Sequence, residues 1–304
     1  MTERRPLQRF GVSETDRIGA GGESIVYAFG PDRVLRLWRT ATLGHVERLA
    51  ELLTRLDRGA VPFRLPEMLE LHDVDGRVVS VERLIPGVPM STALRALRGP
   101  QRADALRSFV RAAAKLPRAG WGFDAWGDLL SPDAVRTSSW NEYLVRKLRL
   151  VVGWAAPSLR AHLPDLDPLV DELVERIARI GDVDRPRLVH GDVFPGNVMM
   201  DAAHAVTGVL DLSTHTVAGD PRMDLASAIV QLDVGGPTLA GDWETVTQVV
   251  LSLAPGSHDV IDLYARWYAV YFAQWGDAAL ARWGARVLTA PPLLERARAA
   301  GIAL

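Results

Sequence analysis

Residues 188–211 read Leu-Val-His-Gly-Asp-Val-Phe-Pro-Gly-Asn-Val-Met-Met, then a polar turn, then Val-Thr-Gly-Val-Leu-Asp. Three short runs rich in β-forming residues, 187–189, 198–200 and 206–210, are separated by turn residues, which predicts strands around a tight hairpin. The loops at the strand ends should therefore bring three polar side chains together. These are Asp192, Asn197 and Asp211.

Two carboxylates and an amide that converge in this way suit a hard divalent cation. Mg²⁺ prefers a few oxygen ligands from the protein and takes the others from water and substrate phosphates. Such a site would still leave one carboxylate free for a second role.

The spacing of this motif resembles that of kinases. His190, Asp192 and Asn197, followed by Asp211, are spaced as in the catalytic loop and metal-binding segment of protein kinases. Here Gly191 stands between the histidine and the aspartate. A Gly-Asp-Pro-x-x-Asp-Leu-Ala segment follows at 219–226. This variant resembles the aminoglycoside phosphotransferase family, whose relatives include choline kinases, over most of the chain from about Ile18.

The resemblance implies an α+β, two-lobed, protein-kinase-like fold. The N-terminal lobe, residues 1–86, would hold an antiparallel sheet with one helix and bind the nucleotide phosphates. The C-terminal lobe, residues 87–304, would be larger and mostly helical, and would carry the catalytic loop, the metal site and the acceptor-binding helices. Pro86-Gly87 is the expected boundary.

The resemblance also implies roles for single residues. Asp192 would accept the proton of the substrate hydroxyl, and Asn197 and Asp211 would hold Mg²⁺. His190 and Asp220 would support the catalytic loop.

A glycine-rich segment near the N-terminus is the second motif. Gly19, Ala20, Gly21 and Gly22 precede Ser24 and a β-branched, aromatic run, so they are expected to join two strands rather than open a helix. Glycines there would let backbone N–H groups approach a phosphate. An ordinary glycine-rich hairpin is the alternative, and the downstream motif favours the phosphate loop.

A kinase needs a cation on the third strand, and Arg36 occupies that position. Arginine binds phosphate as a planar fork, and the alternative is an exposed strand arginine. The phosphate role is favoured because Arg36 alternates with the apolar Leu35 and Leu37 and so faces away from them. Residues 45–56 are predicted to form the helix that carries the acidic partner of this cation. Glu47 and Glu51 are the candidates, and either could instead be a solvated surface charge.

Residues 81–87 resemble the family's hinge, where the adenine edge would meet backbone groups. The residues of this segment expected to contact the nucleotide are Glu82, Arg83 and Leu84.

Late in the chain six aromatic side chains recur at helical spacing between residues 264 and 275. A helix that faces the core is the favoured interpretation. The alternative is an aromatic wall for an acceptor with flat or apolar parts.

Composition limits the other possibilities. The 304 residues carry a formal net charge of -2, which argues against a nucleic-acid or membrane-surface partner. Cysteine is absent, so disulfides, thiolate catalysis and cysteine-based zinc sites are excluded. No apolar run approaches the ~18 residues that a membrane span requires, so a soluble, cytoplasmic protein is expected.

Together the motifs predict a phosphotransferase that moves the γ-phosphate of ATP or GTP to a hydroxyl of a small molecule, with Mg²⁺ as cofactor. The acceptor could be an antibiotic such as an aminoglycoside or a macrolide. The alternatives are a metabolic kinase for an amino alcohol or sugar, and a nucleotide-binding pseudokinase. The sequence leaves open the acceptor, the choice between ATP and GTP, and the oligomeric state.

Overall fold

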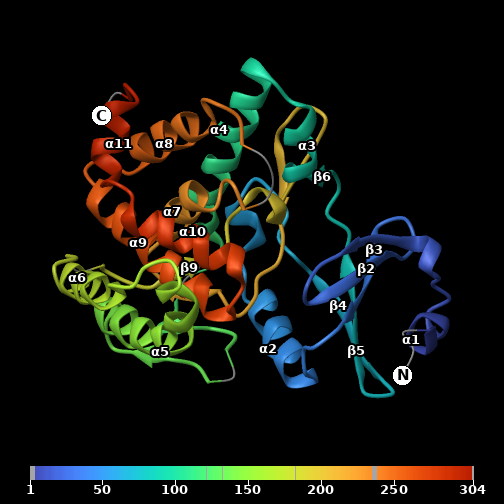
Figure 1. Cartoon of the computed structure of the whole chain (residues 1–304). Helices are drawn as coiled ribbons and strands as arrows, with labels where there is room; N and C mark the ends of the chain where they lie inside the picture. Colours follow the sequence, from blue (N-terminus) through green and yellow to red (C-terminus); the bar gives the residue numbers. More distant parts are fainter. Residues whose placement is uncertain (1–3, 121, 132, 182, 235–237, 303–304) are drawn as a thin grey trace.

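The structure is a computed structural model that describes residues 4–120, 122–131, 133–181, 183–234 and 238–302. It confirms the two-lobed α+β architecture, with a twisted sheet on one side and a helical body on the other (Figure 1). The sheet of the smaller lobe is antiparallel, in the order β1-β2-β3-β5-β4. Its strands are β1 Arg17–Ala20, β2 Ser24–Ala28, β3 Arg33–Trp38, β4 Met68–Val74 and β5 Arg77–Arg83.

The two faces of β3 serve different purposes. Leu35 and Leu37 point into a small core under the sheet, which also contains Leu7 from α1, Arg4–Arg9. Because side chains alternate along a strand, Arg36 and Trp38 point the other way, towards the helical lobe. Trp38 accordingly belongs to the large core of the molecule.

Helix α2 spans Leu43–Thr54, two residues earlier at each end than the sequence pattern indicated. Thr42 caps its N-terminus by accepting a hydrogen bond from the His45 backbone N–H. Its buried residues, Val46, Leu49, Leu52 and Leu53, lie at helical spacing.

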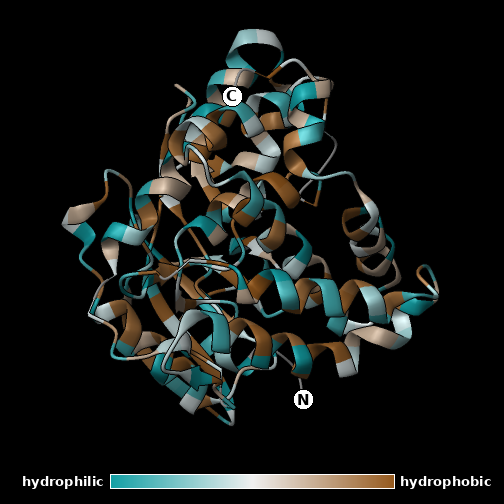
Figure 2. Ribbon diagram, turned by 90° about the vertical axis from the view of Figure 1, so that its left-hand side faces the viewer, coloured by the Kyte–Doolittle hydropathy of each residue, from teal (hydrophilic) through white to brown (hydrophobic). Residues whose placement is uncertain are grey.

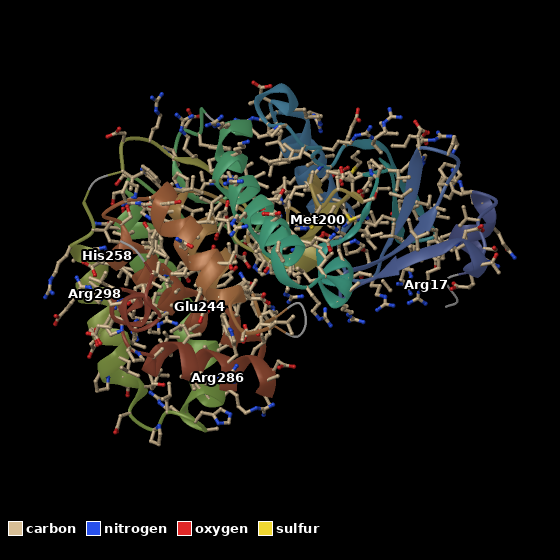
Figure 3. The ribbon with its side chains drawn as sticks, turned by 90° about the horizontal axis from the view of Figure 1, so that it is seen from above. Arg17, Met200, Glu244, His258, Arg286 and Arg298 are labelled. Atoms are coloured by element: carbon tan, nitrogen blue, oxygen red, sulfur yellow. The ribbon has the colours of Figure 1, made fainter. Side chains whose placement is uncertain are left out.

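The chain enters the larger lobe beside the hairpin predicted at residues 198–210. Strand β6, Val88–Pro89, pairs with β10, Val198–Met200, which in turn pairs with β11, Val206–Val209. Gly87 has φ +123°, and a Cβ there would lie 2.4 Å from the carbonyl oxygen of Met200. Glycine is therefore required at this crossing. In Figure 3 Met200 lies between the sheet and the helical body.

The predicted hairpin is confirmed for the second and third runs only. The first run, β9 Arg187–Val189, joins a separate sheet in the order β8-β7-β12-β9. Its other strands are β7 Trp126–Asp128, β8 Arg136–Thr137 and β12 Val217–Gly219. The catalytic loop therefore runs from one sheet to another.

Helices form the remainder of the larger lobe. Helix α9 lies at its centre and packs against α5, α7 and α10. Its aromatic side chains are buried up to Phe272, as the core interpretation predicted. The helices are α3 Met90–Ala96, α4 Gly99–Lys115, α5 Trp140–Arg160, α6 Leu166–Ala178, α7 Arg222–Val230, α8 Asp242–Leu253, α9 His258–Phe272, α10 Ala278–Thr289 and α11 Leu293–Ala299.

The helices of the larger lobe alternate hydrophobic and hydrophilic stretches along their length (Figure 2). Within the described residues, none of the helices combines the length and apolarity needed to cross a bilayer.

Candidate active site

The catalytic loop, residues 190–197, is held by a buried carboxylate of α7. Asp224 accepts hydrogen bonds from the backbone N–H groups of His190 and Gly191, each at 3.0 Å. This corrects the expectation that Asp220 supports the loop directly. The Asp220 carboxylate instead pairs with Arg222 at 2.6 Å and accepts a hydrogen bond from the hydroxyl of Tyr264 at 2.7 Å.

Burial raises the pKa of Asp224 to about 7, although its two backbone hydrogen bonds act in the opposite direction. Gly191 has φ +82°, and a Cβ there would lie 2.0 Å from the carbonyl oxygen of His215. This close approach explains why the position between His190 and Asp192 is glycine.

His190 connects the catalytic loop to the segment that carries Asp211. Its Nε2 lies 2.7 Å from the carbonyl oxygen of Leu210, and its Nδ1 lies 3.3 Å from the backbone N–H of Asp192. Nε2 must therefore carry the proton, while Nδ1 accepts. Burial lowers the pKa of this imidazole, which keeps it neutral. The geometry is that of a residue that braces the loop.

Asp192 lies near the start of the loop, and the Asn197 side chain contacts it. The Asn197 side-chain nitrogen donates to the backbone oxygen of Asp192 at 3.0 Å and to its Oδ2 at 3.2 Å. Burial raises the pKa of Asp192 to about 7, and the nearby charge of Asp211 adds to the effect. Because both contacts use the amide nitrogen, the amide oxygen of Asn197 is left as an acceptor that can face a cation.

Asp211 and Arg36 connect the two lobes across 175 positions of sequence. Arg36 Nη1 lies 3.2 Å from Asp211 Oδ1, and Arg36 Nε lies 3.2 Å from Glu82 Oε1. Burial acts to lower the pKa of Arg36, but the two carboxylates outweigh it and raise the pKa. Asp211 has φ +67°, a left-handed conformation that is uncommon outside glycine and is found at functional sites.

The acidic partner of Arg36 is thus Glu82 rather than Glu47 or Glu51. Both of those glutamates lie on the exposed face of α2. Glu82 is buried, and its Oε1 also accepts a hydrogen bond from Ser80 at 2.7 Å. The Glu82 side chain therefore has a role beside the strand cation, and the contact of its backbone with a nucleotide stays a prediction.

The other two hinge residues are also engaged by the protein. The Arg83 side chain forms ion pairs with Asp32 at 2.5 Å and Glu67 at 3.4 Å. The Leu84 backbone N–H donates to Asp32 O at 2.9 Å, and its carbonyl accepts from Arg64 at 3.3 Å. The backbone N–H and carbonyl groups of Leu84 are therefore less available to an adenine ring than the sequence suggested.

The glycine-rich segment joins β1 to β2 as predicted, with Gly21 N–H bonded to Ser24 O at 2.9 Å. A Cβ at Gly21 or Gly22 would meet nothing within 4 Å, and at Gly19 it would only touch Val26 at 3.9 Å. No packing contact within the described chain therefore requires glycine here. Close approach of a ligand to the loop would explain it.

Glu23, at the tip of the same loop, was not singled out from the sequence. Burial raises the pKa of its carboxyl, and Asp211 raises it further, while Arg36 opposes both effects. Glu23 is thus close enough to Asp211 and Arg36 for their charges to affect its carboxyl.

A cavity of about 230 Å³ opens beside Asp192. Gln231 lines it, donates to Ser227 Oγ at 2.6 Å, and hydrogen-bonds to the Asp192 side chain. Reasoning from the sequence missed Gln231, for which no local signal exists. The cavity is lined by Asp192, Phe194, His215, Gln231, Val234, Phe272, Trp275, Leu280 and Trp283.

Comparison with known proteins places this arrangement in context. Among curated proteins none matches the chain significantly. A GDP complex of wild-type aminoglycoside 2'-phosphotransferase-IIIa aligns with a TM-score of 0.61 at 17% identity, over 98% of this chain and 97% of that one. The GDP and kanamycin complex of APH(2")-IIia aligns with a TM-score of 0.58 at 18% identity, over 98% of both chains.

The solved structures share the fold with this chain, and the sequence profile of one family covers nearly all of it. That profile, described as the phosphotransferase enzyme family, matches residues 14–299. The chain therefore belongs to the phosphotransferase enzyme family.

Proposed function

We propose that the protein transfers the γ-phosphate of ATP or GTP to a hydroxyl of a small molecule. The observation that carries the proposal is the convergence of Asp192, Asn197, Asp211 and Arg36 at the junction of the two lobes. The nucleotide would lie under the glycine-rich segment. The acceptor would enter from the cavity on the other side of Asp192.

The residues present fit a magnesium ion. Asp211 offers the oxygen that Arg36 does not contact, and Asn197 offers its amide oxygen, because its nitrogen is used by Asp192. No cluster of three or more acidic, histidine or cysteine side chains suited to a metal occurs in the described chain. Two protein ligands are nevertheless enough for Mg²⁺, which completes its shell with water and phosphate oxygens. When bound, the ion would neutralise developing phosphate charge.

The chain's own groups would supply positioning and proton acceptance. Asp192 would hold the acceptor hydroxyl in line with the γ-phosphate and take its proton, late in a largely dissociative transfer. Asn197 and Gln231 orient the carboxylate for that role. Arg36 would bind the phosphates, and its pairing with Glu82 fixes its fork in the direction of Asp211.

The glycine-loop contacts of Gly19, Ala20, Gly21, Gly22 and Ser24 with nucleotide stay predictions of this proposal. The open space around the loop and the GDP bound by the structural neighbours support them. Aminoglycoside acceptors are suggested by one neighbour's kanamycin complex only.

The test is nucleotide turnover with Mg²⁺ across a panel of hydroxylated compounds. Asp192→Asn should lower turnover by about 10²–10⁴-fold, the usual contribution of a positioned base. Asp171→Asn, an exposed aspartate of α6, is the matched control and should leave turnover unchanged. Absence of Mg²⁺-dependent nucleotide binding, or full activity in Asp192→Asn, would contradict the proposal.

A further inference from the structure

The cavity beside Asp192 has a mostly apolar wall. Its volume of about 230 Å³ accommodates a ring system of moderate size rather than a single water cluster. The described lining comes from the loop at 190–197, from His215, from the residues directly after α7 and from the segments around α9 and α10. Helices α9 and α10 lie side by side in Figure 1. Aromatic and aliphatic side chains supply most of it.

Charge is nearly absent from this wall. Asp192 carries the single carboxyl group among the described residues that line the cavity, and none of those residues is a lysine or arginine. Burial, with smaller contributions from His190 and Lys147 and against an opposing effect of Asp211, lowers the pKa of His215 to about 4. Its imidazole is therefore neutral at pH 7. Gln231 adds a polar but uncharged group.

The aromatic rings are fixed by one another. Phe272 lies 5.7 Å from Trp275 with planes tilted by 31°, and 6.2 Å from Trp283 with planes at 69°. His215 is held between Phe272, at 5.5 Å, and Trp275, at 5.2 Å, and its Nδ1 lies 3.1 Å from the hydroxyl of Tyr271. The wall is therefore rigid and preformed, which lowers the cost of binding a rigid ligand.

Trp275 continues this apolar surface to the mouth of the cavity. It is 52% exposed, and Val234 beside the same cavity is 43% exposed. Exposed large apolar groups around a cavity are typical of a site that takes apolar surface out of water.

A polycationic acceptor would fit this site poorly. Each ammonium group placed against the wall would lose its hydration without gaining a carboxylate, and isolated charges are expensive to desolvate. An aromatic wall can attract a cation through its ring faces. Nearby, Lys147 Nζ pairs with Asp128 Oδ2 at 2.8 Å, so neither side chain offers a free charge to an ammonium group.

We propose that the acceptor is an uncharged alcohol whose body is apolar and ring-bearing, held against Phe272, Trp275 and Trp283 with its hydroxyl at Asp192. This inference rests on the proposed function, since it assigns the substrate class of the same site. It adds that amine recognition is not part of this site.

The test uses pairs of alcohols of equal shape that differ in charge. One pair is 2-cyclohexylethanol and N-(2-hydroxyethyl)piperidine, which is protonated at pH 7, and the other is 3,3-dimethylbutan-1-ol and choline. Kd is measured by calorimetry on the full chain with Mg²⁺ and a non-hydrolysable nucleotide, and KM by nucleotide turnover. The neutral member of each pair should bind roughly tenfold or more tightly. Added methylenes should lower Kd by roughly fourfold each until the cavity is full.

Substitutions in the cavity wall distinguish a specific loss of acceptor binding from a general loss of protein integrity. Trp275→Ala should raise the Kd of 2-cyclohexylethanol at least tenfold while leaving nucleotide binding unchanged. Trp154→Ala, a tryptophan of α5 that is 56% exposed, is the matched control and should change neither value. Leu280→Glu should shift preference towards the piperidine, whereas Leu280→Gln should not.

Preference for the charged member of either pair, or for kanamycin, would overturn the inference. Equal affinity for both members, or failure of the neutral alcohols to bind saturably, would do the same. Calorimetry reports on the wall even without turnover. Neutral binding that Trp275→Ala abolishes would therefore support the cavity assignment while a lack of transfer counted against the proposed function alone.

Discussion

Replacing Asp192 with asparagine should make the protein more stable while it removes activity. The carboxyl is buried, and its pKa is about 7 in the folded chain against 3.8 for an unperturbed aspartate. At any pH above about 7 the folded state therefore holds a charge in an environment that disfavours it. Asparagine has the same shape and no charge.

The magnitude follows from proton linkage. Below pH 3.8 the carboxyl is protonated in both folded and unfolded chains, so it does not affect the pH dependence of stability. As pH rises towards 7, the unfolded chain has lost this proton and the folded chain keeps it, so stability falls. Above pH 7 the full penalty applies, about 4 kcal/mol at about 1.4 kcal/mol per pH unit. Asparagine gives up one acceptor for the Asn197 amide, which offsets about 1 kcal/mol.

Urea denaturation of the metal-free and nucleotide-free protein measures the difference. We expect Asp192→Asn to raise the free energy of unfolding by about 3 kcal/mol at pH 8 and by less than about 1 kcal/mol at pH 5. An equal gain at the two pH values would show that the charge is not responsible. A loss of stability at pH 8 would refute the assignment of Asp192 as a strained, functional carboxylate.

Three further substitutions test the site and the fold. Arg36→Lys keeps the charge but loses the fork that reaches two carboxylates, so the nucleotide KM should rise about tenfold in steady-state assays. Glu23→Gln removes a negative charge near Asp211 and should lower the nucleotide KM about threefold, whereas the exposed Glu47→Gln should not change it. Asp242→Ala removes the carboxylate that the buried Arg102 guanidinium contacts at 2.6 Å, and should lower the free energy of unfolding by about 3–5 kcal/mol in urea denaturation.

Features of the fold that depend on local chemistry were predictable from the sequence. Thr42 and Ser139, residue types that favour the N-cap position, cap α2 and α5, and each accepts a hydrogen bond from the backbone N–H of the third residue after it. The alternation of Leu35, Arg36 and Leu37 correctly placed the cation on the opposite face from its neighbours. Sequence patterns are enough to predict features that depend on residues only a few positions apart in the chain.

The partners of the site residues were not predictable, because they depend on how distant strands and helices align. The register of β3 and β5 sets Arg36 opposite Ser80, which brings Glu82, two residues further on the same face, to the guanidinium. No property of Glu82 alone distinguishes it from the acidic residues of α2. Likewise, the sequence does not show whether Asp220 or Asp224 holds the loop. The position of α7 in the fold decides that Asp224 reaches the backbone N–H group of His190.

The six aromatic side chains between residues 264 and 275 belong partly to the core and partly to the cavity wall. Tyr264 and Tyr268 are fully buried in the core, as the favoured interpretation held, whereas Phe272 lines the cavity and Trp275 extends past the end of α9 to its mouth. Helical spacing placed these rings on one face. Where the core ends along that face depends on how α10 packs beside it.

The electrostatics of the junction connect these observations. The guanidinium of Arg36 pairs with the carboxylates of Asp211 and Glu82. The charge of Asp211 also affects two further carboxyls, those of Asp192 and of Glu23 in the glycine-rich loop. Burial is the largest cause of the raised pKa values of Asp192 and Glu23, and the excess negative charge of Asp211 raises them further. A divalent cation at Asp211 and Asn197 would offset this excess and return Asp192 towards its ionised form, the state that accepts a proton. The imbalance that destabilises the free protein is therefore the property that would favour metal-bound nucleotide.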